Sequence, residues 1–421
     1  MTGLVLSAPA SGSGKTTLTL GILRALARRG VQVRSAKSGP DYIDPRFHAR
    51  ASGSDCLNLD AWAMTPERLR GLASGPGVLV VEGAMGLFDG APPQNKGSTA
   101  DLARHLGLPV VLIVDAAKMA GSIAALVAGF ARFDPTITVA GVILNKVGSA
   151  RHEAMLRRAL APLGLPVIGA VPRASGVEHP SRHLGLVQAS ERSDLDDFID
   201  RTADLIETHI DLDALVSLAA GLPQAAPPAI TPPAQRIAVA SDVAFAFAYP
   251  HLLRGWQAAG ATVLPFSPLA DDPVPAADLI YLPGGYPELY AGQIAASQFI
   301  KNINIASQTT DIYGECGGYM TLGDGLVDAD GHRHAMAGLL RLETSFAQRK
   351  LHLGYRTVTG NHPIWGGTWA AHEFHYATTL RTDGDPLFSA TDAEGQSLPP
   401  MGLTLGRVAG SFAHLIDRRG R

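Results

Sequence analysis

The chain has 421 residues, 46% of them hydrophobic, and a formal net charge of −3, which suits two or three globular domains and gives no global indication of a nucleic-acid partner. Its two cysteines, Cys56 and Cys316, are too few for a disulfide framework or a zinc site and favour a reducing compartment. Because the N-terminus lacks a signal-peptide pattern and the longest apolar run, residues 119–131, is too short to span a bilayer, we expect a soluble, cytoplasmic protein without a membrane partner.

The first thirty residues predict a strand, a small-residue loop and an amphipathic helix. Apolar residues recur at helical spacing from Leu18 to Leu26, and Gly30 supplies the stop. This arrangement is typical of a loop that holds nucleotide phosphates, because backbone N–H groups and a helix N-terminus face the anion. Pro9 stands where such loops normally begin with Gly, so the loop must start differently. The residues expected to hold ATP are Ser11, Gly12, Ser13, Gly14, Lys15, Thr16 and Thr17. Of these, Lys15 would reach the outer phosphates and Thr16 would ligate Mg²⁺.

Acidic residues follow two of the next predicted strands. A strand over 31–36 leads into a loop with Asp41 and Asp44, and a strand over 78–81 delivers Glu82. In a parallel sheet these residues lie at the carboxyl edge, where ligands bind. Turn chemistry is the alternative for Asp41 and Asp44. We expect Glu82 to hold the Mg²⁺ of the nucleotide, with Asp89 as a weaker candidate.

Three more buried strands are predicted over 110–114, 139–144 and 166–171. Asp115 follows the first of them and is interpreted as a helix N-cap rather than an outer-sphere acid. The pair Asn145-Lys146 follows the second and is consistent either with a contact to a purine edge or with a turn. Alternation of apolar strands with helices predicts an α/β fold with a parallel sheet covered on both faces.

Residues 221–235 contain five prolines and no charge, which predicts a semi-extended linker. New strands are expected over 237–240, 262–264 and 279–282. We therefore divide the chain into a nucleotide-binding domain (1–220), the linker (221–235) and a second α/β domain (236–421).

Cys316 lies in Gly-Glu-Cys-Gly-Gly-Tyr, a sequence typical of a sharp strand-to-helix turn that exposes a nucleophile. The helix N-terminus that follows favours a thiolate. A buried structural cysteine is the alternative. The candidate bases are His414 and the pair His372 and His375, whose spacing of three differs from that of a zinc-protease helix.

Seven motifs in this order resemble the cobyrinic or hydrogenobyrinic acid a,c-diamide synthases of cobalamin biosynthesis. They are the phosphate loop, Lys-Ser-Gly-Pro-Asp-Tyr-Ile-Asp-Pro, Glu-Gly-Ala-Met-Gly-Leu-Phe-Asp-Gly, Leu-Pro-Gly-Gly-Tyr-Pro-Glu, Glu-Cys-Gly-Gly-Tyr-Met, His-Glu-Phe-His-Tyr and Gly-Ser-Phe-Ala-His. The resemblance runs from residue 4 to His414. It implies an N-terminal domain similar to dethiobiotin synthetase, of the P-loop NTPase class, and a C-terminal domain similar to class I glutamine amidotransferases.

The resemblance implies an ATP-dependent carbon–nitrogen ligase that amidates the a and c acetate groups of a polycarboxylate corrinoid with ammonia from glutamine. Cys316 would be the nucleophile and His414 its base and acid. An oxyanion hole is implied at Gly284, Gly285 and Gly317. Asp41, Asp44, Glu82 and Asp89 match acidic positions for magnesium or substrate, and a homodimer is expected. The alternatives are cobyric acid synthase, nickel-sirohydrochlorin a,c-diamide synthase and, from another class, a non-catalytic P-loop regulatory ATPase.

One position departs from the class I pattern, which places a Glu two residues after the catalytic His. Ile416 occupies it here, so Asp417, Glu373 or a backbone carbonyl is left to orient His414. Arg349, Lys350 and Arg356 form a cationic cluster that either receives substrate carboxylates or is a solvated surface.

Overall fold

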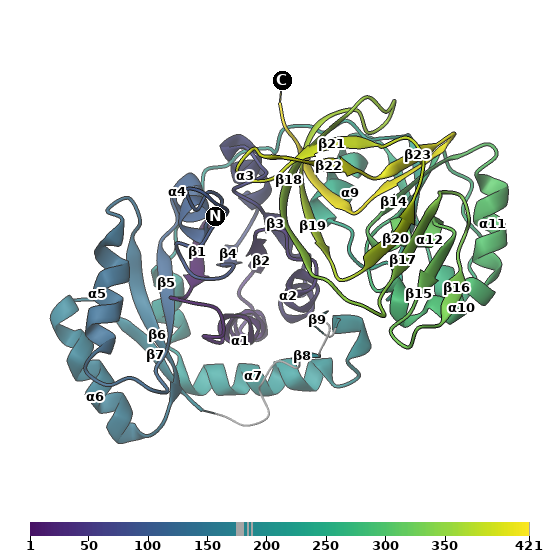
Figure 1. Ribbon diagram of the computed structural model, residues 1–421. Helices are drawn as coiled ribbons and strands as arrows, with labels where there is room; N and C mark the ends of the chain where they lie inside the picture. Colours follow the sequence, from purple (N-terminus) through teal and green to yellow (C-terminus); the bar gives the residue numbers. More distant parts are fainter. Residues whose placement is uncertain (174–180, 183–184, 187, 421) are drawn as a thin grey trace. The chain divides into compact units, whose positions relative to one another are not determined.

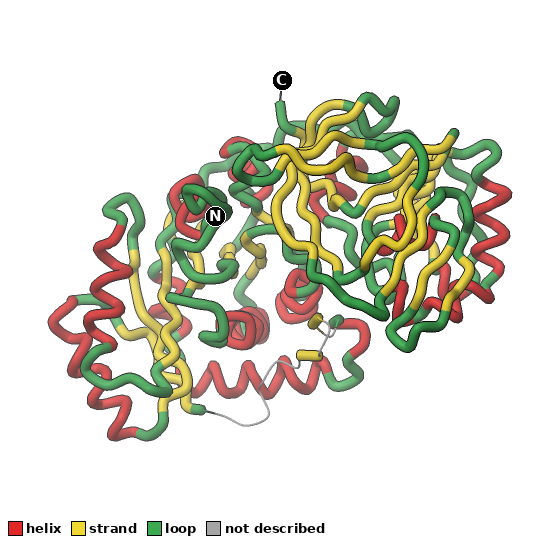
Figure 2. Tube along the Cα trace, viewed as in Figure 1, coloured by secondary structure: helices red, strands yellow, loops and turns green. Residues whose placement is uncertain are grey.

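The computed structural model describes residues 1–173, 181–182, 185–186 and 188–420, and its helices and strands are drawn in Figures 1 and 2. The chain forms two compact units, Met1–Pro228 and Ala229–Arg421. In the described part of the chain, none of the helices combines the length and the apolar character needed to cross a bilayer.

The first unit is built on a parallel sheet with the strand order β3-β2-β4-β1-β5-β6-β7, and β10 pairs antiparallel with β1. Its strands are β1 (Thr2–Ser7), β2 (Val33–Ser38), β3 (Leu57–Leu59), β4 (Val78–Glu82), β5 (Val110–Asp115), β6 (Val139–Val147), β7 (Val167–Pro172) and β10 (Ala220–Gly221). Its helices are α1 (Lys15–Arg28), α2 (Asp44–Ser52), α3 (Pro66–Ala73), α4 (Thr99–Leu106), α5 (Ile123–Phe133), α6 (Ala150–Leu160), α7 (Leu195–His209) and α8 (Leu212–Ser217). A short hairpin of β8 (Ser181–Arg182) and β9 (Gly185–Leu186) is separate from this sheet.

The parallel sheet predicted for the N-terminal half is confirmed, because its central strands are continuously apolar and buried. The predicted bounds of two strands near the site were wrong. β2 begins and ends two residues later than predicted, so Lys37 lies inside the strand instead of after it. β6 continues through Asn145 and Lys146 to Val147, although Lys146 has a left-handed backbone with φ of 58°.

Helix α1, which follows the phosphate loop, lies against α7 (Figure 1). Gly21 allows this close approach, since a Cβ there would lie 2.5 Å from Ile206 Cγ1 and 2.9 Å from Thr202 Cγ2. At the rim of the contact, Arg24 forms an ion pair with Asp200 at 3.1 Å. The long α7 therefore holds the helix that carries Lys15 in place.

The second unit contains three sheets. A mostly parallel sheet has the order β12-β11-β13-β14-β24-β23, with β23 antiparallel at its edge. Its strands are β11 (Arg236–Ala240), β12 (Thr262–Phe266), β13 (Leu279–Leu282), β14 (Asp311–Glu315), β23 (Leu403–Leu405) and β24 (Val408–Ser411). The helices of this unit are α9 (Pro250–Ala258), α10 (Ala291–Ala296), α11 (Gln298–Ala306) and α12 (Gly317–Leu322).

The strands of the other two sheets lie within residues 325–401 and 413–418, where no strand was predicted. One has the order β16-β15-β17-β20 and consists of β15 (Gly325–Val327), β16 (Arg333–Ala335), β17 (Leu342–Ser345) and β20 (Thr378–Thr382). The other has the order β22-β21-β18-β19-β25 and consists of β18 (His352–Gly360), β19 (Gly367–His375), β21 (Phe388–Thr391), β22 (Ser397–Met401) and β25 (Ala413–Arg418). β25 follows β24 after a single residue, Phe412, so the two kinds of sheet meet there.

The proline-rich stretch 222–235 carries no helix or strand. The division between the two compact units falls inside it, after Pro228. Before that point, Pro227 packs so closely on Gly71 of α3 that a Cβ on the glycine would lie 2.2 Å from Pro227 Cα. The first part of the stretch therefore lies against the first unit.

Candidate active sites

The loop between β1 and α1 has the backbone expected of a phosphate cradle. Gly12 and Gly14 have φ angles of 79° and 88°, in the left-handed region that glycine adopts at little cost. A Cβ on Gly14 would lie 2.2 Å from Asn145 Nδ2, so the position also needs glycine for space. Ser13 Oγ closes the turn by donating to Ala10 O at 2.8 Å. Successive N–H groups of such a loop, next to a helix N-terminus, suit an anion.

Lys15 is the first residue of α1 and is 8% exposed as a whole. Its Nζ donates to Met85 O at 2.5 Å, which places the amine over the loop that follows β4. Burial lowers the pKa of Lys15, although Glu82 acts in the opposite direction. A bound phosphate would supply the negative charge that this buried cation lacks.

Three oxygen ligands meet beside the phosphate loop. Thr16 Oγ1 donates to Glu82 Oε1 at 2.7 Å and lies 3.4 Å from Asp44 Oδ2. Lys37 Nζ lies between the same two carboxylates, 2.7 Å from Glu82 Oε1 and 2.5 Å from Asp44 Oδ2. These hard oxygens are the donor set that Mg²⁺ prefers, and in this state a lysine ammonium lies among them.

The sequence reasoning missed Lys37 and His48 as members of this cluster. Lys37 faces Glu82 because the two are register partners on β2 and β4. Although burial opposes its charge, Asp44 and Glu82 raise the pKa of Lys37 well above its usual value. His48 Nε2 lies 2.6 Å from Glu82 Oε2, and its other ring nitrogen lies 3.5 Å from Cys56 Sγ. Burial favours the protonated form of Glu82, but Lys37 and His48 outweigh it and lower the pKa of that carboxyl.

Asp41 and Asp89 lie at the edge of this cluster and also shape loops. Asp41 Oδ1 accepts from the backbone N–H groups of Ile43 at 2.8 Å and Asp44 at 3.1 Å, at the start of α2. Burial and the nearby Asp44 raise the pKa of Asp41 to about 7. Asp89 Oδ2 accepts from Gly86 N at 2.8 Å, and its charge acts on Lys15.

The interpretation of Asp115 as a helix cap was wrong, because the next helix, α5, begins only at Ile123. Asp115 accepts from Ala117 N at 2.9 Å and forms an ion pair with Lys146 at 2.7 Å. Lys146 Nζ also donates to Gly12 O at 3.1 Å, and Asn145 Nδ2 donates to Ser13 O at 2.8 Å. In this structure the Asn145-Lys146 pair therefore braces the phosphate loop.

Cys316 lies at a sharp turn between β14 and α12. Its φ of 46° is in the left-handed region and is strained for a residue with a side chain. The turn is closed by a bond from Cys316 N to Ser411 O at 2.8 Å. The flanking glycines permit it, because a Cβ on Gly314 would lie 2.7 Å from Gly318 O, and one on Gly318 would lie 2.0 Å from Leu282 O. The turn predicted from Gly-Glu-Cys-Gly-Gly is therefore present.

The thiol lies next to a histidine and to the loop after β13. A Cβ on Gly284 would lie 2.3 Å from His414 Cε1 and 3.3 Å from Cys316 Cβ, so this glycine separates the two side chains. Gly285 N and the Cα of Gly317 are also neighbours, since a Cβ on Gly317 would lie 3.0 Å from that nitrogen. Cys316 Sγ lies 3.8 Å from Phe374 O, a contact that the sequence did not indicate.

Burial makes the thiol less acidic than the sequence suggested. Cys316 is 3% exposed, and this burial, followed by the charge of Glu288, raises its pKa. The expected preference for a thiolate at the helix N-terminus is therefore outweighed in this state, in which no substrate charge or protonated base is present.

Of the three candidate histidines, His414 is the one whose ring meets Gly284 beside Cys316. It is fully buried, and burial together with His372 and His375 lowers its pKa well below the usual value. His414 Nδ1 lies 3.8 Å from Glu315 Oε2. His372 is its register partner on β19. The sequence reasoning did not single out Glu315, although a buried acid at the end of a strand is unusual.

The cationic cluster is divided in the structure. Arg349 and Lys350 are exposed, whereas Arg356 is largely buried and binds Glu373 Oε2 with two nitrogens at 2.8 and 2.9 Å. Glu373 Oε1 lies 3.1 Å from His375 Nε2. Of the two alternatives for this cluster, a solvated surface is wrong for Arg356, and contact with substrate carboxylates remains a prediction.

His352, Glu373 and His375 bring possible ligand atoms within 4.8 Å of one another. The imidazoles of His352 and His375 are stacked, however, with centroids 4.6 Å apart and planes 9° apart. Parallel rings direct their nitrogen lone pairs parallel rather than toward a common ion. The group is therefore better described as an ion-pair and stacking cluster.

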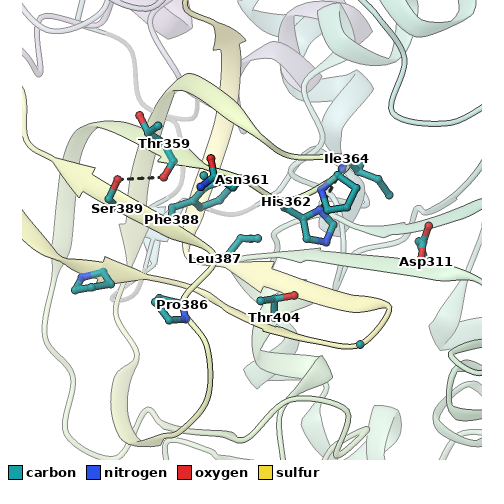
Figure 3. A pocket seen from close by; sticks show the side chains of 14 residues that line it. Asp311, Thr359, Asn361, His362, Ile364, Pro386, Leu387, Phe388, Ser389 and Thr404 are labelled. Atoms are coloured by element: carbon teal, nitrogen blue, oxygen red, sulfur yellow. Dashed lines mark hydrogen bonds between the residues drawn. The ribbon is translucent and has the colours of Figure 1, made fainter.

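A cavity of about 640 Å³ in the second unit is drawn in Figure 3, and Cys316 is not among its lining residues. It is lined by Asp311 at the start of β14, by the loop that contains Asn361 and His362, and by Pro386. Cys316 lies at the opposite end of the same strand. Cavity size alone therefore does not locate the nucleophile.

Comparison with known proteins gives two family matches in the order of the two units. Residues 4–187 match the CobQ/CobB/MinD/ParA nucleotide binding domain, and residues 236–420 match the CobB/CobQ-like glutamine amidotransferase domain. The α/β fold class predicted for both halves is thus confirmed.

Curated relatives match over nearly the whole length. A protein of Brucella anthropi is 55% identical over 434 residues, covering 99% of each chain. A protein of a Sinorhizobium species is 54% identical and covers all of both chains, and one of Rhodobacter capsulatus is 52% identical over 98% of each. All three are named hydrogenobyrinate a,c-diamide synthase.

Proposed function

Since the chain belongs to the hydrogenobyrinate a,c-diamide synthase family, we propose that it converts the a and c acetate carboxylates of hydrogenobyrinic acid to amides, using ATP and ammonia from glutamine. The full-length match to synthases of that name carries the proposal. These names favour the cobalt-free corrinoid over cobyrinic acid. They also favour it over the substrates of cobyric acid synthase and the nickel-sirohydrochlorin enzyme. A regulatory ATPase would have no use for the nucleophile turn at Cys316.

In the second unit, Cys316 would release ammonia from glutamine. His414 takes the thiol proton, and the thiolate sulfur attacks the side-chain carbonyl carbon of glutamine. The oxygen of that carbonyl gains negative charge, which the backbone N–H groups of Gly285 and Gly317, beside Gly284, would stabilise; the proximity of Gly285 N to Gly317 supports this role. His414 then gives its proton to the leaving nitrogen, so that ammonia departs and a γ-glutamyl thioester remains. Water later hydrolyses the thioester to glutamate.

In the first unit, the phosphate loop would hold ATP, with backbone N–H groups of residues 11–15 on the phosphates and Lys15 on the transferred group. Thr16, Asp44 and Glu82 would hold Mg²⁺, which supplies charge neutralisation at the phosphates. An acetate carboxylate attacks the terminal phosphorus of ATP, the bond to the bridging oxygen breaks and ADP leaves, which gives an acyl phosphate. Ammonia then attacks the acyl carbon, loses a proton and displaces inorganic phosphate to leave the amide. Asp41 and Asp89 are proposed to position the acid.

Lys37 would help the anionic substrate carboxylate to approach the acidic cluster. Its ammonium lies beside Glu82 and Asp44, which concentrate negative charge where an anionic carboxylate has to approach. A cation there reduces the repulsion between the acidic cluster and the substrate. We further propose that the stretch 221–235 links two domains, 1–220 and 236–421, and that the enzyme is a cytoplasmic homodimer without nucleic-acid or membrane partners.

The proposal is tested by giving the purified enzyme ATP, Mg²⁺ and hydrogenobyrinic or cobyrinic acid, with either glutamine or ammonium as nitrogen source. Mass spectrometry then identifies the amides. We expect Cys316→Ala to lose glutamine-driven synthesis and to keep ammonia-driven synthesis, and Lys15→Ala to lose both. Equal loss of both reactions in Cys316→Ala would contradict the division of labour, and faster turnover of cobyrinic acid would contradict the choice of corrinoid.

A further inference from the structure

The imidazole of His414 needs a partner that fixes one nitrogen while the other serves the thiol. The residue two positions further on, Ile416, is apolar and fully buried, and its backbone oxygen is 2.8 Å from His251 Nε2. Ile416 therefore offers no side-chain acceptor to His414.

The two other acids considered from the sequence are poorly placed for this role. Glu373 is held by Arg356 and His375. Asp417 lies three residues from His414, beyond a register shift in β25, and its Oδ1 accepts from Arg418 N at 3.1 Å.

Glu315 meets the requirement. Its Oε2 lies 3.8 Å from His414 Nδ1, and the two side chains are 2% and 0% exposed. This separation is longer than a hydrogen bond, but contacts of catalytic groups are often long before substrate binds and shorten in the complex. Because water is excluded, charges at this distance interact strongly.

The carboxylate of Glu315 is held from two other sides. Tyr281 on β13 donates its hydroxyl to Oε2 at 2.8 Å. The backbone N–H of Leu415, next to His414, donates to Oε1 at 3.2 Å. The acid is thus fixed both by the sheet that carries the nucleophile and by the strand that carries the histidine.

We propose that Glu315 is a positioning residue for His414, an inference that rests on the proposed glutamine hydrolysis at Cys316. In its ionised form the carboxylate accepts from Nδ1–H, and this orients Nε2 to take the thiol proton of Cys316. When that proton arrives, the imidazolium and the carboxylate form an ion pair, which lasts until the proton passes to the leaving ammonia. Glu315 directly precedes Cys316 in the sequence, whereas the class I pattern places its Glu two residues after the catalytic His.

The ionisation of Glu315 is coupled to the protonation of His414. Burial raises the pKa of Glu315 to about 8, against the effect of the Tyr281 and Leu415 hydrogen bonds. A neighbouring imidazolium favours the ionised carboxylate. The Glu315 charge is therefore stabilised when His414 becomes protonated.

The test compares Glu315→Gln, which keeps the shape, with Glu315→Asp, which keeps the charge. For Glu315→Gln we expect the kcat of glutamine hydrolysis to fall on the order of 100-fold while KM changes less than about threefold. Glu315→Asp should recover part of the lost kcat. Alkylation of Cys316 by iodoacetamide, followed by peptide mass spectrometry, should slow in Glu315→Gln. Glu394→Gln, an exposed acid of the same unit, is the matched control and should behave as the parent.

Ammonia-driven synthesis separates positioning from folding. If Glu315→Gln loses glutamine hydrolysis but keeps ammonia-driven synthesis, the proposal stands. Unchanged kcat in Glu315→Gln, or equal loss of both reactions, overturns the positioning role. A parent enzyme without glutamine hydrolysis, or a Cys316→Ala variant that retains it, would instead overturn the proposed function from which this inference starts.

Discussion

Replacing Gly284 with alanine adds one methyl group between the thiol and its histidine. That Cβ would lie 2.3 Å from His414 Cε1 and 3.3 Å from Cys316 Cβ. Gly284 is not among the glycines with a left-handed backbone, so the effect is steric alone. To reach an ordinary contact the imidazole has to move by about 1 Å, and a displacement of this size costs about 100-fold in rate, or about 2.7 kcal/mol of activation free energy.

The assay measures glutamate release from glutamine and, separately, amide formation from ammonium. We expect Gly284→Ala to lose about 100-fold in the first and to keep the second, because the phosphate loop lies in the other unit. Gly292→Ala is the matched control, since its nearest neighbour, His334 Cε1, would be 3.5 Å away. Glutamine hydrolysis in Gly284→Ala within about threefold of the parent would refute the idea that His414 serves Cys316 across this glycine.

Three further predictions concern stability, pH and nucleotide. Gly21→Ala should destabilise the first unit by about 1–3 kcal/mol in urea unfolding, because its Cβ would collide with Ile206. Gly129→Ala is the control: its Cβ would have nothing within 4 Å, so it should be neutral or stabilise by up to about 1 kcal/mol. Equal changes in unfolding free energy for the two variants would refute the packing argument. The folded pKa of Glu315 is raised to about 8, so the stability that its carboxyl contributes is complete below about pH 4 and is lost as the pH rises through 8. Unfolding followed by tryptophan fluorescence should therefore show the parent losing stability relative to Glu315→Gln over that range, and a constant difference would contradict it. ATP should raise the melting temperature of the parent but not that of Lys15→Ala, and an equal rise in both would contradict the assignment of Lys15.

The phosphate loop was predictable because its features are local. Its parts follow one another directly in the sequence: a buried strand, a loop with Gly12 and Gly14, and a helix that starts at Lys15. The turn at Cys316 was predictable for the same reason, since its glycines adjoin it. Neither prediction required knowledge of how distant strands pair.

The residues that were missed depend on long-range register. Lys37 meets Glu82 only because β2 ends two residues later than its apolar pattern suggests. Glu315 meets His414 only after β24 pairs with β14 and the chain continues through Phe412 into β25. The sequence left a surface position open for Arg356, because its contact with Glu373 depends on the pairing of β18 with β19.

The two smaller sheets of the second unit were also missed. Their strands are partly exposed and alternate irregularly, as in β18, whose only buried residue is Val358. A strand of this kind lacks both the continuous apolar run of a parallel sheet and a regular alternation. Its pairing partners, rather than its own sequence, determine its structure.

The central claim is that one chain transfers the side-chain nitrogen of glutamine to two carboxylates of hydrogenobyrinic acid. The most direct measurement supplies amide-¹⁵N glutamine with unlabelled ammonium in solution and determines the isotope content of the product by mass spectrometry. The account predicts a diamide in which both new nitrogens are ¹⁵N for the parent and unlabelled nitrogens for Cys316→Ala. A parent product without the label, or a corrinoid that stays unamidated while glutamine and ATP are consumed, would contradict it.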